Sequence, residues 1–549
     1  MTSDAMRETL LCAQTPEQVL TNSAAIYPDH DALYIPSSAC AHYSDAPIAL
    51  TYRMLKAAVD AQTDIWAATG ITGRVALVLE NRPAFFIHWL ALNALGVSVI
   101  PLNHEMPDEE FPYYLEHSEA HAVVVLREHY DRLIDISRLM STSVIVVADD
   151  AVAEHAFGTA CSPIDADPAR ECALLYTSGS TGKPKACVLS NDYFIQQGRW
   201  YRALDGHISL REGQERLLTP LPLSHMNAMS VSTMAMFMTG GCLIQLDRFH
   251  PTTWWQSVRE SQATALHYLG VLPAILLALP ACDSDDLSNQ VRFGFGAGVN
   301  PAHHERFEQR FGFPLIEAWA MTECGAGGAI IANREPRHVG QCCFGKPGSD
   351  VEWQLVDEQK AIVPAGTPGE LRVRAHGTDP RKGYFSGYLK NPEATAEIWL
   401  EGWLNTGDVA VELEDGSLAF VDRRKNIIRR SGENISALEV EAALGDHIAI
   451  EAAVATPVPD EMRGDEVAVC IVLKKGYPDN DDTAMNIQAH ALNKLIYFKA
   501  PGWLVFCDTL PVTASNKPKR GDIKVLARDS VVAGKAVDLR HLKKRRGVS

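Results

Sequence analysis

The segment Thr177-Ser-Gly-Ser-Thr-Gly-Lys-Pro-Lys185 decides how the rest of this sequence is interpreted. It lies between two apolar runs, 173–176 and 186–189, which predict short strands. Its glycines let backbone N–H groups approach phosphate oxygens, and its hydroxyls and lysines add donors and positive charge. It is not a Walker A loop, because Pro184 follows Lys183 where that pattern has Ser or Thr. We therefore predict a phosphate-binding loop between two strands.

The first 330 residues alternate short β-branched runs with longer amphipathic segments. That alternation is typical of an α/β protein. A helix is expected over 83–95, ended by Gly96. Further buried strands are expected at 75–79, 97–102, 123–126, 144–147, 242–246, 265–269 and 291–295. The pattern predicts a large N-terminal domain that contains two α/β subdomains.

The composition changes near residue 339 and becomes rich in Gly and Pro up to Asp422. Short strands at 370–374 and 418–421 predict a small β-barrel-like subdomain there. After a charged stretch, Ser436-Ala-Leu-Glu439 matches a capping box, which predicts a helix from that point to about Leu444. We predict a domain of residues 1–422 and a small α+β domain of residues 423–549.

The bulk properties exclude several classes of protein. The formal net charge of −18 argues against nucleic acid as the main partner, because phosphate backbones require a basic face. No apolar run approaches 18 residues and no secretory signal is visible, so we expect neither a membrane span nor export. Twelve scattered cysteines without a CxxC pair indicate reduced thiols in a cytoplasmic protein. The basic run Lys543-Lys544-Arg545-Arg546 is expected to be a solvated tail.

Six segments of this chain, in order, resemble the motifs of the adenylate-forming superfamily, which includes acyl-CoA synthetases, nonribosomal peptide adenylation domains and beetle luciferases. Besides the phosphate loop they are Leu221-Pro-Leu-Ser-His225, Gly296-Ala-Gly-Val-Asn-Pro301, Glu317-Ala-Trp-Ala-Met-Thr-Glu323, Thr406-Gly-Asp408 with Asp422 to Asn434, and Pro511-Val-Thr-Ala-Ser-Asn-Lys517. The resemblance spans about residues 50–525. It implies that ATP activates a carboxylic acid as an acyl-adenylate, with Mg²⁺ as cofactor and coenzyme A as co-substrate.

The resemblance also implies which residues of the large domain bind the nucleotide. Phosphate contacts are implied for Thr177, Ser178, Gly179, Ser180, Thr181, Gly182, Lys183, Lys185 and Thr322. Adenine contacts are implied for Gly296, Ala297, Gly298, Glu317, Ala318, Trp319, Ala320 and Met321. Asp408 and Arg423 are implied for the ribose, and Glu323 for Mg²⁺. Trp319 and Ala320 stand where the family usually has Tyr and Gly.

Further roles come from the same resemblance. Lys517 is implied as the catalytic lysine between the attacking carboxylate and the α-phosphate, although Asn516 and Pro518 depart from the family pattern. Lys425 is implied as the hinge about which the small domain rotates between half-reactions. The segment Ser431-Gly432-Glu433 is implied to approach the thiol acceptor. His225 is implied to flank the acyl pocket and gate the pantetheine arm.

Several readings of the function remain open from the sequence. The segment 429–436 most resembles small-acid CoA ligases, including crotonobetaine/carnitine-CoA ligases, which favours an acyl-CoA synthetase. A stand-alone adenylation enzyme that loads a carrier protein in trans is the alternative, and a luciferase-like oxygenase or a non-catalytic ATP-binding relative has less support. The sequence does not identify the carboxylic acid that is activated. The pocket for this acid is expected near residues 225–229, 270–272, 297–299 and 319–321. A homodimer is left open.

Overall fold

The computed structural model describes residues 9–177, 184–282, 284–431, 433–460, 463–512 and 517–543. Two compact units make up the chain, and each is described by itself. The larger contains Met1–Trp353 and Val373–Asn405, and the smaller contains Gln354–Arg372 and Thr406–Ser549. The predicted boundary at residue 422 lies inside the smaller unit and stays a prediction. No helix within the described residues has the length and apolar character that a membrane crossing requires.

A seven-stranded sheet in the larger unit carries the predicted phosphate loop. Its strand order is β18-β8-β7-β4-β3-β5-β6, and β3, β4, β5 and β6 run parallel. The helices α6 (Phe111–His117) and α7 (Tyr130–Arg138) pack against one apolar face. The strands are β3 (Arg74–Val78), β4 (Ser98–Pro101), β5 (Ala122–Val125), β6 (Ile145–Ala148), β7 (Glu171–Thr177), β8 (Lys185–Ser190) and β18 (Gly387–Tyr388).

An eight-stranded sheet forms the second layer of the larger unit, with the order β14-β13-β12-β11-β9-β10-β1-β2. Its central strands β10, β9, β11, β12 and β13 are parallel, so their C-terminal ends share one edge. Helices α10, α11 and α12 contribute to one core on this sheet. The strands are β1 (Asp31–Ile35), β2 (Ile48–Thr51), β9 (Arg216–Thr219), β10 (Cys242–Gln245), β11 (Ala265–Leu269), β12 (Phe293–Ala297), β13 (Leu315–Trp319) and β14 (Ile330–Ile331).

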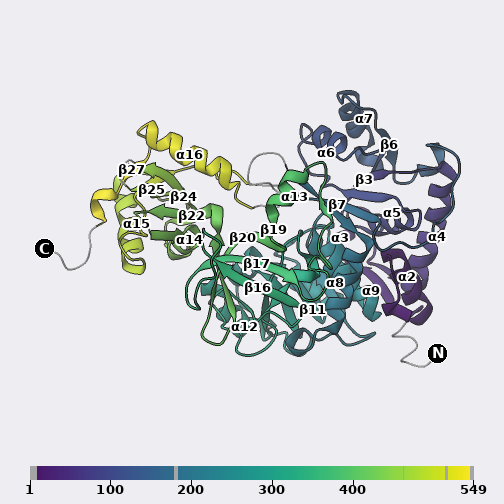
Figure 1. Ribbon diagram of the computed structural model, residues 1–549, viewed down its shortest axis with the longest axis horizontal. Helices are drawn as coiled ribbons and strands as arrows, with labels where there is room; N and C mark the ends of the chain where they lie inside the picture. Colours follow the sequence, from purple (N-terminus) through teal and green to yellow (C-terminus); the bar gives the residue numbers. More distant parts are fainter. Residues whose placement is uncertain are drawn as a thin grey trace. The chain divides into compact units, whose positions relative to one another are not determined.

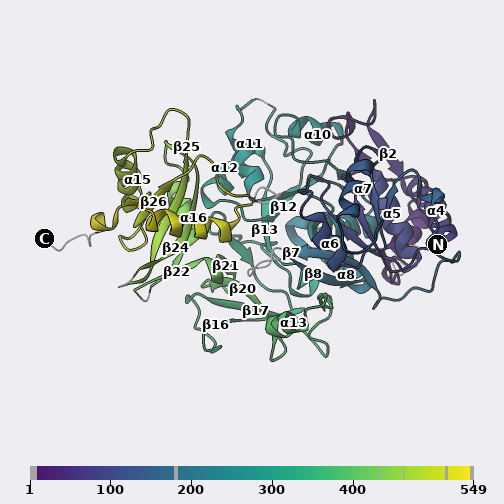
Figure 2. The same cartoon turned by 90° about the horizontal axis from the view of Figure 1, so that it is seen from above.

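The helices of the larger unit are amphipathic or wholly buried according to their place. Helix α5 begins at Pro83 and is followed by Gly96, whose φ of +69° favours glycine. The other helices are α2 (Pro16–Ile26), α3 (Ser37–Cys40), α4 (Tyr52–Thr69), α8 (Asn191–Ala203), α9 (Thr233–Thr239), α10 (Trp254–Glu260), α11 (Val271–Ala278), α12 (Pro301–Phe311) and α13 (Pro392–Ile398), with α5 at Pro83–Ala94. Figure 2 shows α4, α5, α6 and α7 grouped near the N-terminal strands.

A third sheet includes β16 (Val351–Val356), β17 (Gly369–Ala375), β19 (Trp399–Leu400), β20 (Trp403–Glu412) and β21 (Leu418–Arg423). β20 pairs antiparallel with β21 over the range that begins at Asp408 and Arg423. The division between the two units falls within β16, β17 and β20. This sheet corresponds to the small β-rich subdomain that the sequence predicts.

The C-terminal sheet of the smaller unit is covered on both faces. Val467, Val469 and Ile471 of β25 (Gly464–Leu473) pack with α14 (Ala437–Leu444) and α15 (Asp481–Lys494), whereas Ala468 and Cys470 pack with α16 (Arg520–Val532). Figure 1 shows α16 on one side of this sheet and α14 and α15 on the other. The remaining strands are β22 (Ile427–Arg430), β23 (Glu433–Ser436), β24 (Ile450–Asp460), β26 (Trp503–Phe506) and β27 (Val537–Asp538).

The α/β prediction is confirmed, and most predicted strands lie within two residues of their observed bounds. The predicted capping box begins a helix as expected, because the Ser436 hydroxyl accepts from Glu439 N at 3.2 Å. In a capping box the Glu side chain also accepts from the backbone N–H of the N-cap residue. Here the Glu439 carboxylate instead pairs with Lys499 at 2.6 Å. The expected solvated tail is wrong for Lys543, whose side chain is fully buried; residues 544–546 lie outside the described residues.

Candidate active site

The predicted phosphate loop joins two strands, as the sequence predicts. β7 and β8 pair antiparallel, with Thr177 opposite Lys185. Residues 178–183 between them lie outside the described residues, and so do the predictions for Ser178, Gly179, Ser180, Thr181, Gly182 and Lys183. The described part brings Thr177 and Lys185 to the base of the loop.

Tyr388 links a predicted phosphate contact to the predicted metal ligand. β18 pairs with β8 so that Tyr388 lies opposite Cys187, two residues from Lys185. The Lys185 ammonium lies 5.0 Å from the centre of the Tyr388 ring, and the Tyr388 hydroxyl donates to Glu323 Oε1 at 2.7 Å. Tyr388 also lines an open pocket of about 480 Å³ that includes Arg381 and Lys390. Three basic side chains, Lys185, Arg381 and Lys390, therefore lie around Tyr388, and Lys390 is paired with Glu119 at 2.9 Å.

The turn that carries Thr322 and Glu323 is held by main-chain hydrogen bonds. The Tyr193 hydroxyl, on α8, donates to the carbonyl of Thr322 at 3.0 Å. Phe385 N donates to the carbonyl of Glu323 at 3.1 Å. Burial, with the Glu323 charge adding to it, raises the pKa of the Cys187 thiol well above its ordinary value. Glu323 is 6% exposed, so its carboxylate is presented by a rigid surrounding rather than by a surface loop.

Glu323 fits a magnesium ion held mainly by substrate. Mg²⁺ prefers oxygen ligands and is commonly held by one or two carboxylates together with phosphates and water. Across the described ranges, the only three-residue set of possible ligands is Glu80, Glu128 and His129, which does not include Glu323. Glu323 therefore offers one carboxylate rather than a dedicated protein cage, which matches the chemistry of a nucleotide-bound magnesium.

Glu317 organises the predicted adenine loop. Its carboxylate accepts from Gly298 N at 2.8 Å, from Val299 N at 3.1 Å and from the Tyr268 hydroxyl at 2.9 Å. Burial raises the pKa of Glu317, and these donors oppose the rise. The predicted loop residues Gly296 and Ala297 end β12 directly before this contact. Glu317 thus holds the loop backbone, and the implied contact of Glu317 with adenine stays a prediction.

The residues at the end of β13 differ in exposure. Trp319 is 6% exposed, and its ring lies 6.2 Å from that of Phe344. Ala318 and Met321 are half-buried, and Ala320 is exposed. Their place at the C-terminal edge of a parallel sheet is where ligands bind in open α/β sheets. The implied stacking of Trp319 on adenine stays a prediction.

His225 directly precedes an unusual helical segment. Residues Asn227–Ser232 form a π-helix, a feature that is frequent at functional sites. Met229 N donates to the carbonyl of His225 at 3.1 Å, and the His225 side chain is exposed. Behind the π-helix, buried His267 contacts Asn227 Oδ1 at 2.9 Å, and burial lowers the pKa of His267 to about 3. The neutral imidazole is therefore part of the scaffold beneath the predicted acyl pocket.

The predicted ribose contacts lie together in the smaller unit. Asp408 and Arg423 are register partners of β20 and β21, and Arg423 Nε lies 3.0 Å from Asp408 Oδ1. The neighbouring Asp422 is fully buried and accepts from four groups: Arg423 N, Asn426 Nδ2, the Ser436 hydroxyl and Leu438 N. Asp422 therefore connects the predicted hinge segment to the start of α14.

Two predicted lysines of the smaller unit have lowered pKa values. Burial, followed by repulsion from Arg423, lowers the pKa of Lys517. Burial and Arg423 likewise lower the pKa of Lys425, in a short 3₁₀ turn. Lys517 lies on a loop that a hydrogen bond from Lys519 N to the Pro511 carbonyl closes at 2.9 Å. Asn516 lies outside the described residues.

The predicted thiol-facing segment is the tip of a hairpin. β22 and β23 pair antiparallel, with Arg430 opposite Glu433. Ser431 has a φ of +52°, and its N–H donates to the Arg463 carbonyl at 2.8 Å. Gly432 lies outside the described residues.

Two residues that the sequence did not indicate, Tyr388 and Tyr268, prove to be central to these sites, and so does Asp422, whose own role the sequence did not indicate. Tyr388 lies more than 60 residues from Glu323, and Tyr268 lies 49 residues from Glu317. Sequence spacing carries no signal for such contacts, because they depend on strand pairing: β18 pairs with β8, and β12 pairs with both β11 and β13. Asp422 belongs to a quoted motif, but only its fold reveals four donors.

A nucleotide-binding α/β enzyme is the class that this fold and these sites define. Solved structures share the fold over most of their length. An o-succinylbenzoate CoA synthetase from Bacillus subtilis, in complex with its acyl-adenylate intermediate, is 22% identical with a TM-score of 0.78, covering 92% of this chain and 97% of that chain. ATP-bound MatB from Rhodopseudomonas palustris is 21% identical with a TM-score of 0.77, covering 93% and 99%.

Family models match most of the chain. The model of the AMP-binding enzyme matches residues 20–389, and that of the AMP-binding enzyme C-terminal domain matches residues 439–517. The chain belongs to the AMP-binding enzyme family, and the resemblance to the adenylate-forming superfamily is confirmed. A crotonobetaine/carnitine–CoA ligase of Salmonella heidelberg is 28% identical, with 93% of this chain and 99% of that protein covered.

Proposed function

We propose that this enzyme activates a carboxylic acid with ATP and transfers the acyl group to coenzyme A, giving an acyl-CoA and AMP. The observation that carries the proposal is the contact chain from Lys185 through Tyr388 to Glu323, which joins a predicted phosphate contact to the predicted magnesium ligand. The names of the relatives support coenzyme A as the acceptor, because a CoA ligase covers nearly the whole chain.

In the first half-reaction, an oxygen of the substrate carboxylate attacks the α-phosphorus of ATP. The bond to the bridging oxygen breaks, and pyrophosphate leaves with its electron pair. Lys517 would neutralise charge between the two anions, and Lys185 would bind phosphate oxygens. Glu323 would hold Mg²⁺, which when bound screens the phosphate charge.

In the second half-reaction, the thiol sulfur of coenzyme A attacks the acyl carbon. The bond from that carbon to the AMP oxygen breaks, AMP leaves with the electron pair, and the thiol proton passes to solvent. We assign Ser431, Gly432 and Glu433 to the thiol side and Lys425 to the hinge between the predicted domains 1–422 and 423–549. His225 would flank the acyl pocket at the start of the π-helix.

A panel of carboxylic acids, scored by AMP release with coenzyme A and MgATP, tests the proposal. The expected result is AMP release with one class of acid and recovery of the matching acyl-CoA. A phosphopantetheine-bearing carrier protein, offered in place of coenzyme A, tests the alternative acceptor. Pyrophosphate exchange without acyl-CoA formation would contradict coenzyme A as the acceptor and leave adenylation intact.

A further inference from the structure

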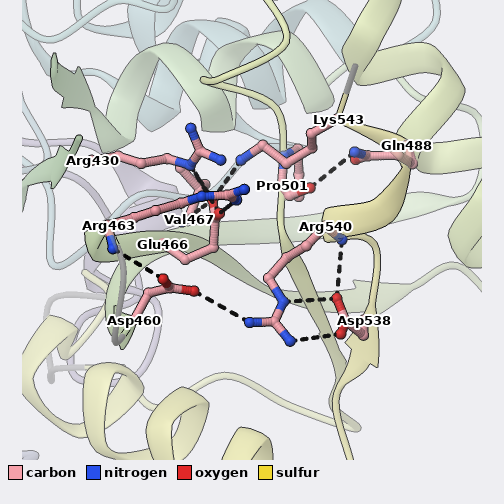
Figure 3. Close-up of polar contacts among 10 residues, drawn as sticks. All are labelled: Arg430, Asp460, Arg463, Glu466, Val467, Gln488, Pro501, Asp538, Arg540 and Lys543. Atoms are coloured by element: carbon pink, nitrogen blue, oxygen red, sulfur yellow. Dashed lines mark hydrogen bonds and ion pairs between the residues drawn. The ribbon is translucent and has the colours of Figure 1, made fainter.

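A buried carboxylate in the smaller unit is surrounded by three cations. Glu466 is fully buried, and its oxygens accept from Arg430 Nε at 2.8 Å, from Arg463 Nη1 at 3.1 Å and from Lys543 Nζ at 2.5 Å. Val467 N adds a fourth donor at 2.9 Å. Figure 3 shows these side chains converging on Glu466 from separate segments. We call Glu466, Arg430, Arg463 and Lys543 the Glu466 cluster.

The electrostatics of the cluster favour the charged form of Glu466. Burial alone would raise the pKa of Glu466, but the cations, Lys543 foremost, hold that pKa below its ordinary value. Burial lowers the pKa of Lys543 to about 8, although Glu466 opposes the shift. Since three positive charges face one negative charge, removing Glu466 would leave buried cations uncompensated, which is strongly unfavourable. The cluster therefore constrains where its four members lie.

The cluster is attached directly to the tip of the β22–β23 hairpin. Arg430 is the last residue of β22 and pairs with Gly464, next to Arg463. The Arg463 carbonyl accepts from Ser431 N at 2.8 Å, so the tip is held by the main chain and through the Arg430 side chain. Lys543 brings the segment after α16 to the same carboxylate. The hairpin tip, the β24–β25 turn and the C-terminal segment thus meet at Glu466.

We propose that Glu466 and Lys543 are positioning residues for thioester transfer, because they set the positions of Ser431 and Glu433 at the hairpin tip through Arg430. The inference rests on the proposed function, in which this tip faces the thiol. A displacement of about 1 Å at a positioned reacting group can cost about 100-fold in rate. Adenylation uses Lys517, on a different loop, so loss of the cluster affects the two half-reactions unequally.

Lys543→Met in the full chain tests the proposal, with an acid that supports AMP release. We expect ATP–pyrophosphate exchange within about 2-fold of the unaltered enzyme and single-turnover acyl-CoA formation lowered about 10- to 100-fold. Retained exchange also reports that the smaller unit is folded, since Lys517 belongs to it. If Lys543→Met does not fold, Arg463→Met is the milder variant, because its side chain is 34% exposed, and it should lower transfer about 3-fold.

Arg540→Ala is the matched control. Arg540 lies on the same C-terminal segment and pairs with Asp538 at 2.8 Å and with Asp460 at 3.2 Å. Asp460 also accepts from Arg463 N at 3.1 Å, but neither partner is a ligand of the Glu466 carboxylate. We expect both half-reactions within about 2-fold in this variant. An equal loss of transfer in Arg540→Ala, equal loss of both half-reactions in Lys543→Met, or unchanged transfer in Lys543→Met would overturn the proposal. If the unaltered enzyme forms no acyl-CoA, the proposed function itself fails.

Discussion

The two compact units hold their site residues by different electrostatics. In the larger unit, buried carboxylates lie among neutral donors: Glu317 accepts from two backbone N–H groups and a tyrosine, and Glu323 accepts from Tyr388. In the smaller unit, Lys425 and Lys517 are repelled by Arg423, which helps to lower the pKa of both. A carboxylate surrounded by donors fixes backbone geometry. A lysine repelled by another cation gains more when a nucleotide anion binds.

The two carboxylates of the larger unit differ as well. Glu317 and Glu323 are six residues apart and equally buried, each 6% exposed. Glu317 receives donors on both oxygens, whereas the hydrogen bond to Glu323 comes from a tyrosine hydroxyl that also faces Lys185. Equal burial therefore does not mean an equal role, because the donors decide whether a carboxylate organises the chain or faces a ligand.

The largest effect on adenylation is expected from a lysine of the smaller unit. Lys517→Ala should lower adenylate formation about 10²- to 10³-fold, the scale of losing one preorganised charge contact. ATP–pyrophosphate exchange with a competent acid measures it. Lys519→Ala, two residues away and exposed, is the control and should stay near the unaltered rate. Near-normal exchange in Lys517→Ala would remove this lysine from the mechanism.

On the carboxylate side, Glu323→Gln should lower adenylation about 100-fold, because it removes the charge that would hold Mg²⁺. A titration of exchange rate against magnesium concentration checks it, and a partial recovery at high magnesium is expected. Glu305→Gln on α12 is an exposed control. An unchanged magnesium dependence would exclude Glu323 as the ligand.

Glu317→Gln separates loop organisation from chemistry. The amide group would turn an N–H toward backbone N–H donors, so we expect the KM for ATP to rise about 10-fold with kcat within about 3-fold. Tyr268→Phe removes one donor and should raise that KM only about 2-fold. Steady-state kinetics with ATP varied measures both. A fall in kcat without a change in KM would assign Glu317 to the chemical step.

The smallest effect expected is a change in pH dependence. The proposed mechanism uses Lys517 in its protonated form, and the pKa of Lys517 is lowered. Adenylation should therefore fall with rising pH at a lower pH than an ordinary lysine would impose. Lys517→Arg should move this fall to higher pH, because guanidinium stays charged. Rapid-quench adenylate formation across pH 7 to 10 measures it. An identical alkaline profile in both proteins would show that another group titrates.

Local features of this chain could be predicted from sequence because local forces produce them. The Ser436 cap, the Gly96 helix end and the strands that flank the phosphate loop depend on neighbouring residues alone. The sequence predicts Asp408 and Arg423 as two separate ribose contacts. The register of the β20–β21 hairpin places these two residues opposite each other. Lys543 shows the opposite case. Its basic neighbours predict a side chain exposed to solvent, but Lys543 is buried and pairs with Glu466, which is distant in the sequence.

By itself, the sequence determined the class of chemistry: an α/β enzyme with a Ser/Gly-rich phosphate loop, ordered motifs of an adenylate-forming family and a C-terminal lysine. Only the tertiary structure decided what each charged group does. Glu317 holds the backbone of the predicted adenine loop, Tyr388 links Lys185 to Glu323, and Glu466 is the centre of a cation cluster. The reason is physical: a side chain's charge and pKa depend on donors, burial and neighbours, which strand pairing and chain reversal bring from distant positions.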